Sequence, residues 1–166
     1  MDKGGLPMHW IRDFGFDSDS ARLYIVCQRT LSIWDVQKQE CIRKVEMPSV
    51  YSGSLYSLVL MNTETPMIAT GSSNGDILMW DAESLDELGC LAGHTGTVET
   101  LSQKSAEHLI SGSHDYSIKV WDVSERSCVQ CVDKHEGPVT CLLSLCANNR
   151  VYSASEDATI KLWNAI

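Results

Sequence analysis

The sequence predicts an all-β fold built from four similar units of four short strands each. One observation is that short apolar runs alternate with polar turns, as in residues 109–123, where residues 113–115 separate two such runs in the manner of a tight hairpin. The second observation is that a tryptophan closes one run in every unit, with spacings of 46, 41 and 42 residues between Trp34, Trp80, Trp121 and Trp163.

This period indicates a β-propeller. Repeats of about 40–45 residues with a Gly-His pair early and a Trp-Asp pair late are typical of one four-stranded blade each. Gly93-His94 and Trp121-Asp122 are such pairs. We therefore expect an N-terminal tail at residues 1–7 and blades at about 8–48, 49–91, 92–132 and 133–166. Because little chain follows Trp163, the last blade lacks room for its outer strand, and the expected propeller is partial or open.

The first two blades are predicted in chain order from their apolar runs. In blade one, residues 9–14 form the inner strand with Ile11 and Phe14 as its buried pair, residues 23–27 and 31–36 the middle strands, and 41–45 the outer strand. In blade two, the inner strand lies within residues 51–58, the middle strands at 67–71 and 77–80, and the outer strand at 88–91. The polar loop 62–66 accounts for the extra length of this blade.

Blades three and four repeat the arrangement more clearly. The inner strand of blade three is expected within residues 93–101, its hairpin at 109–123, and its outer strand at 128–132. Blade four begins within residues 135–142 and continues through 150–155 and 159–163.

Four side chains recur at fixed offsets in these two blades. Serine precedes aspartate by four residues, and aspartate precedes tryptophan by six, in the sets His94, Ser111, Asp115, Trp121 and His135, Ser153, Asp157, Trp163. Blade two keeps Thr70, Asn74 and Trp80 at these offsets, with Tyr51 in place of the histidine. In blade one the same spacing selects Tyr24 and Gln28, and only Trp34 retains its type.

With these residues the chain resembles the WD40-repeat family over residues 8–166, most closely in blades three and four. The resemblance implies that the four side chains form a buried hydrogen-bond network that locks the inner loop to the middle strands. A His, Ser and Asp set also suggests a nucleophilic enzyme. Its repetition in two blades favours a structural role, and no Gly-x-Ser-x-Gly elbow or phosphate-binding Gly-rich loop accompanies it. We therefore expect a non-enzymatic protein without a cofactor.

The resemblance further implies that partners dock on one rim of the propeller. The rim positions flank the buried aliphatic residue of each inner strand or precede the aspartate of the hairpin turn. They are Trp10, Arg12, Ser54, Tyr56, Ser73, Thr97, Glu99, His114, Pro138, Thr140 and Glu156. Trp, Tyr and Arg most often dominate interfaces, so Trp10, Arg12 and Tyr56 are expected to form a peptide- or protein-binding group. The alternatives are packing of Trp10 under the tail, an isolated exposed Tyr56, and ordinary turn chemistry for His114.

Charge and cysteine content restrict the partners and the compartment. The net charge of −9, from 13 basic and 22 acidic residues, argues against nucleic acid and anionic membrane as partners. No apolar run is long enough to cross a bilayer. Seven cysteines without an apolar N-terminal signal favour a reducing compartment, cytoplasmic or nuclear. Cys128 and Cys131, with Cys141 and Cys146, have loose zinc-like spacing, but the first two face opposite sides of a strand, which disfavours a metal site.

The predicted function is therefore a scaffold that binds other proteins or peptides. A substrate-recognition module of a ubiquitin ligase and a tail module of a larger motor or signalling protein are alternatives. Some ligase receptors carry Arg two residues after the Asp of Trp-Asp, and none follows Asp35, Asp81 or Asp122. Three ways of completing the ring stay open, namely further blades in a larger propeller, self-association of two copies into eight blades, and a closed four-blade ring.

Overall fold

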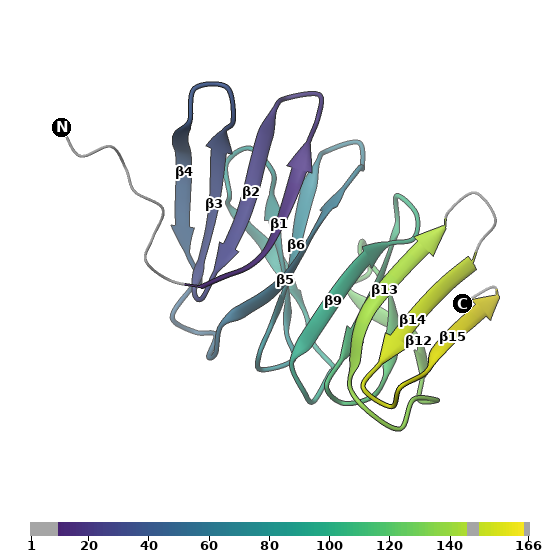
Figure 1. Cartoon of the computed structure of the whole chain (residues 1–166). Helices are drawn as coiled ribbons and strands as arrows, with labels where there is room; N and C mark the ends of the chain where they lie inside the picture. Colours follow the sequence, from purple (N-terminus) through teal and green to yellow (C-terminus); the bar gives the residue numbers. More distant parts are fainter. Residues whose placement is uncertain (1–9, 146–149, 165–166) are drawn as a thin grey trace.

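The computed structural model describes residues 10–145 and 150–164, so the predicted tail, His9 and Cys146 lie outside the described part of the chain. The described residues fold into four antiparallel sheets, and they include no helix. The sheets follow one another in chain order and stand side by side as the blades of an open propeller (Figure 1). The all-β, partial-propeller prediction is confirmed.

Blades one and two are complete four-stranded meanders, in which each strand pairs with the next in the chain. Blade one consists of β1 (Ile11–Asp17), β2 (Arg22–Cys27), β3 (Thr30–Asp35) and β4 (Glu40–Glu46). Blade two consists of β5 (Leu55–Met61), β6 (Met67–Ser72), β7 (Ile77–Asp81) and β8 (Glu87–Leu91).

Blade three is also complete, whereas blade four has three strands in the described residues. Blade three consists of β9 (Val98–Gln103), β10 (His108–Ser113), β11 (Ile118–Asp122) and β12 (Ser127–Val132). Blade four consists of β13 (Val139–Leu145), β14 (Arg150–Ser155) and β15 (Ile160–Asn164). Among the described strands, β15 therefore has a partner on one side only, while β3, β7 and β11 each pair with a fourth strand.

The core lies between blades rather than within them. Three clusters of buried side chains join blade one to two, two to three, and three to four. In the first two clusters the tryptophan of the later blade is buried, with Trp80 1% and Trp121 0% exposed. Because a single sheet cannot bury its own faces, each blade depends on its neighbours for its apolar contacts.

The expectation that Ile11 and Phe14 form a buried pair is wrong. Their side chains are 46% and 64% exposed, although both lie in the predicted inner strand β1. Their counterparts in the later blades are buried because each packs on a preceding blade, and the described chain has no blade in front of blade one.

Candidate functional site

A β-bulge opens every inner strand at the same position, on the lower edge of the molecule in Figure 1. In blade one, Ile11 pairs with Cys27 and Asp13 with Val26, which leaves Arg12 as the extra residue. The extra residues of blades two, three and four are Tyr56, Glu99 and Thr140. Bulges re-aim side chains and recur next to functional sites. The four predicted rim residues that follow the first aliphatic residue of each inner strand are thus the residues that the backbone turns outward.

Six of the other predicted rim residues are joined in pairs by one recurring backbone bond. The N–H groups of Ser73, His114 and Glu156 donate to the carbonyls of Ser54, Thr97 and Pro138, at 2.8, 2.9 and 3.0 Å. The inner-strand entry and the hairpin tip therefore meet in each of these three blades. None of the eleven predicted rim residues is buried.

Arg12 lies close to the rings of Trp10 and Tyr56, the two aromatic residues that the sequence analysis predicted beside it. Its guanidinium carbon is 4.3 Å from the ring centroid of Tyr56 on blade two and 5.9 Å from that of Trp10. Both distances are in the range of cation–π attraction. Trp10 is 78% exposed, and among the described carboxylates none forms an ion pair with Arg12. The group therefore presents a large apolar surface together with an available cation.

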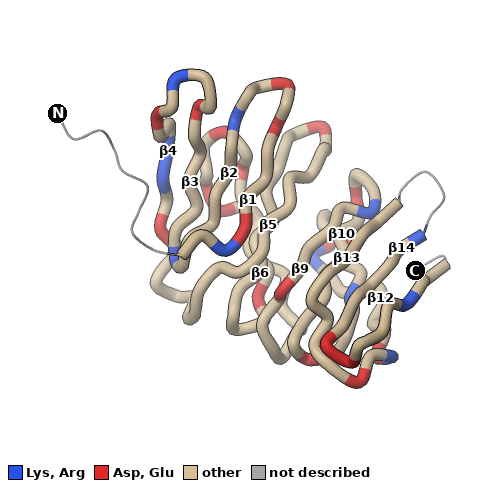
Figure 2. The backbone as a smooth tube through the Cα atoms, viewed as in Figure 1, with Lys and Arg blue, Asp and Glu red and all other residues tan. Residues whose placement is uncertain are grey.

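The opposite end of the rim is acidic. Glu99 is paired with His114, whose Nε2 lies 3.2 Å from Glu99 Oε1, and Glu156 is exposed at the hairpin tip of blade four. Figure 2 shows a basic and an acidic residue next to each other at the start of β1, and mostly acidic residues with a basic one along the lower edge of the blade that holds β13 and β14. Among the charged residues of the predicted rim, the sign therefore changes from positive in blade one (Arg12) to negative in blades three and four (Glu99 and Glu156).

In blade three the four recurring side chains form one chain of hydrogen bonds. The indole Nε1–H of Trp121 donates to Ser111 Oγ at 2.7 Å, and Ser111 Oγ lies 2.7 Å from His94 Nε2. His94 Nδ1 lies 2.7 Å from Asp115 Oδ2. A neutral imidazole satisfies every group if Ser111 donates to Nε2 and Nδ1–H donates to the carboxylate. Ser111 is 0% exposed, so its hydroxyl holds the blade together rather than facing solvent.

Burial sets the ionisation of this network. Burial lowers the pKa of His94 below its ordinary value, although Asp115 acts in the other direction. For Asp115 burial raises the pKa, but hydrogen bonds from Ser117, the Thr95 N–H and His94 outweigh it and lower the pKa to about 2. A neutral histidine beside an ionised carboxylate is thus the arrangement at neutral pH.

Blade four repeats the network with distances within 0.1 Å of those in blade three. His135 lies 2.7 Å from both Ser153 Oγ and Asp157 Oδ2, and the Trp163 indole donates to Ser153 at 2.8 Å. The Thr159 hydroxyl and His135 lower the pKa of Asp157.

Blade two retains only part of the network. The Trp80 indole donates to Thr70 Oγ1 at 2.9 Å. The Asn74 side chain instead bonds with Ser72 and Asp76, since no histidine reaches it. Tyr51, in the histidine position, donates to Glu87 at 2.6 Å, and this bond raises the pKa of the Tyr51 hydroxyl.

In blade one, the position that the sequence spacing assigned to Tyr24 is wrong. Trp34 pairs across the strands with Leu23, eleven residues earlier, whereas Trp121 pairs with Leu109, twelve residues earlier. The shorter hairpin places Ile25, not Tyr24, at the position of Ser111. The indole of Trp34 donates instead to Ser32 Oγ at 3.0 Å, a hydroxyl on its own strand.

Sequence reasoning missed Arg29, at the hairpin tip of blade one. Its guanidinium donates at 3.0–3.3 Å to the four carbonyls of Met47, Pro48, Tyr51 and Gly53. These carbonyls belong to the loop that enters blade two, where no histidine network exists. Arg29 therefore holds this loop in place of the missing histidine, and a single arginine in a turn gives no sequence signal of that role.

The described residues offer no group of three or more His, Cys, Asp or Glu side chains that could hold a metal ion. No helix in the same part of the chain has the length and apolarity that a membrane crossing requires.

Comparisons with known proteins agree with this geometry. The family model "WD domain, G-beta repeat" matches residues 85–122 and 126–164. A Danio rerio protein, "p21-activated protein kinase-interacting protein 1-like", is 33% identical over 110 residues, which are 66% of this chain. The chain spans 30% of the length of that relative.

Solved structures share the fold. The crystal structure of the RRP9 WD40 repeats matches with a TM-score of 0.87 and 24% identity, over 99% of this chain and 50% of that one. The structure of U3-55K gives 0.86 and 24%, over 98% of this chain and 50% of that one. The computationally designed Ika4 protein gives 0.81 and 23%, over 97% of this chain and 94% of that one.

Proposed function

The chain is a WD40-repeat protein, and on that premise we propose that it is a non-enzymatic scaffold that captures a peptide or protein segment on its bulged rim. The observation that carries the proposal is the Arg12 group. Three side chains of the types that dominate interfaces meet at one place, and the backbone bulge aims Arg12 and Tyr56 outward. The name of the Danio rerio relative describes a protein that interacts with a kinase, which supports the protein-binding class.

The charges of the rim specify the kind of segment. Arg12 has an exposed cation between two aromatic rings, so it favours a carboxylate side chain with an apolar neighbour that covers Trp10. Blade four offers the exposed carboxylate of Glu156, which favours a basic side chain further along the same segment. We therefore expect an extended segment with an acidic residue over blade one and a basic residue over blade four.

A display library of random peptides tests this proposal without knowledge of the partner. We expect the 166-residue chain to enrich peptides with an acidic residue next to an apolar one, and the Trp10→Ala/Arg12→Ala/Tyr56→Ala variant to lose at least tenfold in affinity for them. The control is Phe16→Ala/Ile42→Ala, which removes exposed apolar side chains of blade one away from the rim. If the triple variant retains full affinity while the control loses it, the rim is not the binding site.

The proposal includes an intracellular location. Six described cysteines are free thiols, and free thiols are typical of reducing compartments. Fluorescence microscopy of the tagged chain tests this point, and a secreted or luminal signal would contradict it.

A further inference from the structure

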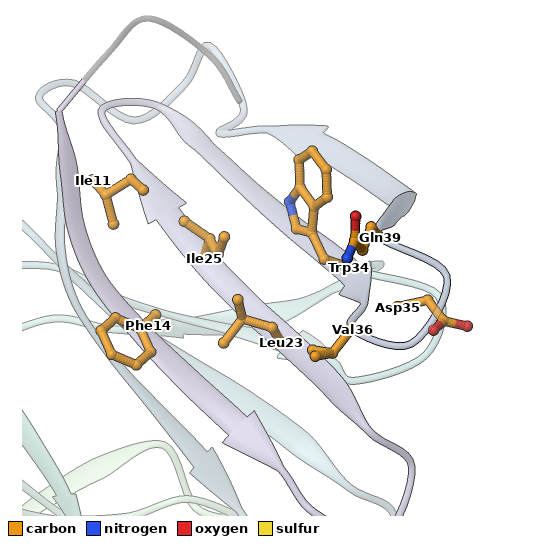
Figure 3. A pocket seen from close by; sticks show the side chains of 8 residues that line it. All are labelled: Ile11, Phe14, Leu23, Ile25, Trp34, Asp35, Val36 and Gln39. Carbon is orange, nitrogen blue, oxygen red and sulfur yellow. The ribbon is translucent and has the colours of Figure 1, made fainter. Parts of the chain in front are cut away.

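The turn between the third and fourth strands has the same backbone in blades one, two and three. It begins at the aspartate that follows the tryptophan, and the residue four positions later has a φ of +57°, +56° and +53° at Gln39, Leu85 and Arg126. In each turn the aspartate carboxylate accepts the backbone N–H of the residue just before this position. Figure 3 shows the position in blade one, where Gln39 lines the same pocket as Trp34 and Val36. The three turns therefore place different side chains at one equivalent position.

Leu85 fills the seam between blades one and two at this position. It is 2% exposed, and it belongs to the same buried cluster as Ile33 of blade one and Trp80 of blade two. The pocket that remains at this end of the seam has a volume of about 330 Å³, and its lining reaches Ala82 but not Leu85. An apolar side chain in the turn therefore closes the outer part of a seam between two blades.

Arg126 leaves the corresponding seam between blades two and three open. It is exposed, and its guanidinium donates to the carbonyl of Leu88 on β8. Gly89 has a φ of +149°, and a Cβ there would lie 2.7 Å from the guanidinium carbon. The missing side chain of Gly89 therefore lets Arg126 lie against this strand. A groove of about 630 Å³ remains between the two blades, and we call it the seam groove.

The seam groove combines apolar side chains with two carboxylates. Its apolar lining residues are Met67, Met79, Leu88, Ala106 and Val123. Methionine is flexible and polarisable, so it adapts to ligands of different shape. Glu64 and Glu107 also line the groove, both are exposed, and neither forms an ion pair with a described residue. Because Arg126 is the one cation in this lining, the groove has a negative charge.

One side chain ties together the two loops that carry these carboxylates. Glu64 lies in the loop 62–66, which gives blade two its extra length. The Asn62 N–H donates to Gln103 Oε1 at 3.1 Å, and Gln103 Nε2 donates to the Asn62 carbonyl at 3.3 Å. Gln103 Nε2 also lies 3.0 Å from the carbonyl of Ser105, in the turn that carries Glu107. The groove is therefore formed before a partner binds.

We propose that the seam groove binds a segment of a partner protein that carries a leucine-sized apolar side chain next to a lysine or arginine. The apolar side chain takes the place that Leu85 fills in the preceding seam, and burial of its surface drives binding. The basic side chain pairs with Glu64 or Glu107, which orients the segment. These turns lie at the end of the blades opposite the bulged rim, so this site is separate from the Arg12 group.

Selection from a display library of random peptides tests the proposal when the target is the Trp10→Ala/Arg12→Ala/Tyr56→Ala variant, which lacks the rim group. We expect enriched peptides in which a leucine, isoleucine or methionine stands next to a lysine or arginine. A selection that enriches no such peptide would overturn the proposal, and it would leave the rim proposal untouched.

The substitution Arg126→Leu gives blade three the side chain that blade two has at Leu85. We expect it to lower the affinity for a synthetic copy of an enriched peptide at least tenfold, while Tm stays equal or rises, because leucine fills the groove. The substitution also removes a positive charge, which by itself would favour a basic peptide, so a loss of affinity reports the filling of the groove. Unchanged affinity would overturn the proposal.

A second variant tests the charges. Glu64→Lys/Glu107→Lys should lower the affinity at least fivefold, because both positions are exposed and the change reverses the charge of the groove. The matched control Glu125→Lys, in the turn of Arg126 but outside the groove lining, should keep the wild-type affinity. An equal loss in the control would show that overall charge, and not the groove, attracts the peptide.

NMR of the methionine methyl groups locates the bound peptide without reference to affinity. We expect nuclear Overhauser contacts between the peptide and the methyl group of Met67. Met47, which is 2% exposed in the cluster between blades one and two, should show none. A bound peptide without a contact to Met67 would contradict the proposal.

Discussion

Blade three and blade one have the same four-stranded meander but are held together by different contacts. In blade three, Trp121 is 0% exposed and ends a chain of hydrogen bonds through Ser111 and His94 to Asp115. In blade one, the indole of Trp34 is half-buried and reaches only Ser32. Both blades nevertheless keep the inner-strand bulge and the same strand order.

The difference shows that strand pairing alone produces the blade, and that the hydrogen-bond network has a separate role in holding a loop. The network ties the loop that enters the blade to its hairpin tip, because His94 lies before β9 and Asp115 lies in the β10–β11 turn. Where the histidine is missing, in blade two, Arg29 of the neighbouring hairpin holds the entering loop. The loop at the rim can therefore be held either by the histidine network or by an arginine of the neighbouring blade.

The largest expected effect is the difference in stability loss when Trp121 or Trp34 is replaced by alanine. Trp121→Ala should lower the free energy of unfolding by about 3–5 kcal/mol, because it removes a fully buried ring and leaves a cavity. Trp34→Ala should cost less than half as much, because its ring is only half-buried. Urea denaturation of both variants measures this difference. Equal losses would mean that Trp34 is buried by a contact within the single chain.

The next largest effect is the difference in stability loss when Ser111 or Ser32, the hydroxyls that accept from these indoles, is replaced by alanine. Ser111→Ala leaves the Trp121 N–H and His94 Nε2 without partners in a dry core, at a cost of about 1–3 kcal/mol. Ser32→Ala should cost less, since the half-buried Trp34 can bond with water. The same denaturation experiment compares them, with Ser124→Ala on an exposed turn as the control. A larger loss for Ser32→Ala would contradict the role given to the network.

The smallest effect is the pH dependence that comes from the histidine network, which blade three has and blade one lacks. The pKa of His94 is lower in the folded chain than the unfolded value of about 6.5, so the unfolded state binds more protons and stability falls as pH drops below about 6.5. Asp115, with its pKa lowered to about 2, adds a further loss of about 1–2 kcal/mol as pH falls from the unfolded value toward 2, after allowance for solvent screening.

The variant His94→Gln isolates the histidine contribution. Thermal unfolding between pH 7 and pH 5 should give a shallower loss of stability for His94→Gln than for the wild type. The matched variant His108→Gln, outside the network, should keep the wild-type slope. If His94→Gln and the wild type have the same slope, the histidine does not titrate as its burial implies.

The sequence by itself determined the blade count, the strand order and the partial ring. It did so because a tryptophan at a fixed spacing and alternating apolar runs are local patterns, and hairpins are local structures. It also brought Trp10, Arg12 and Tyr56 together correctly, because the inner-strand positions of neighbouring blades follow from one alignment.

Only the tertiary structure decided what these patterns contact. The shortened hairpin of blade one moved Ile25 into the network position, and spacing alone could not reveal a change of one residue in a turn. The same apolar pattern buries Leu101 and exposes Phe14, because burial depends on whether another blade lies on that face. Alternation predicts which side of a strand is apolar, whereas the neighbour that covers this side is a property of the assembled ring.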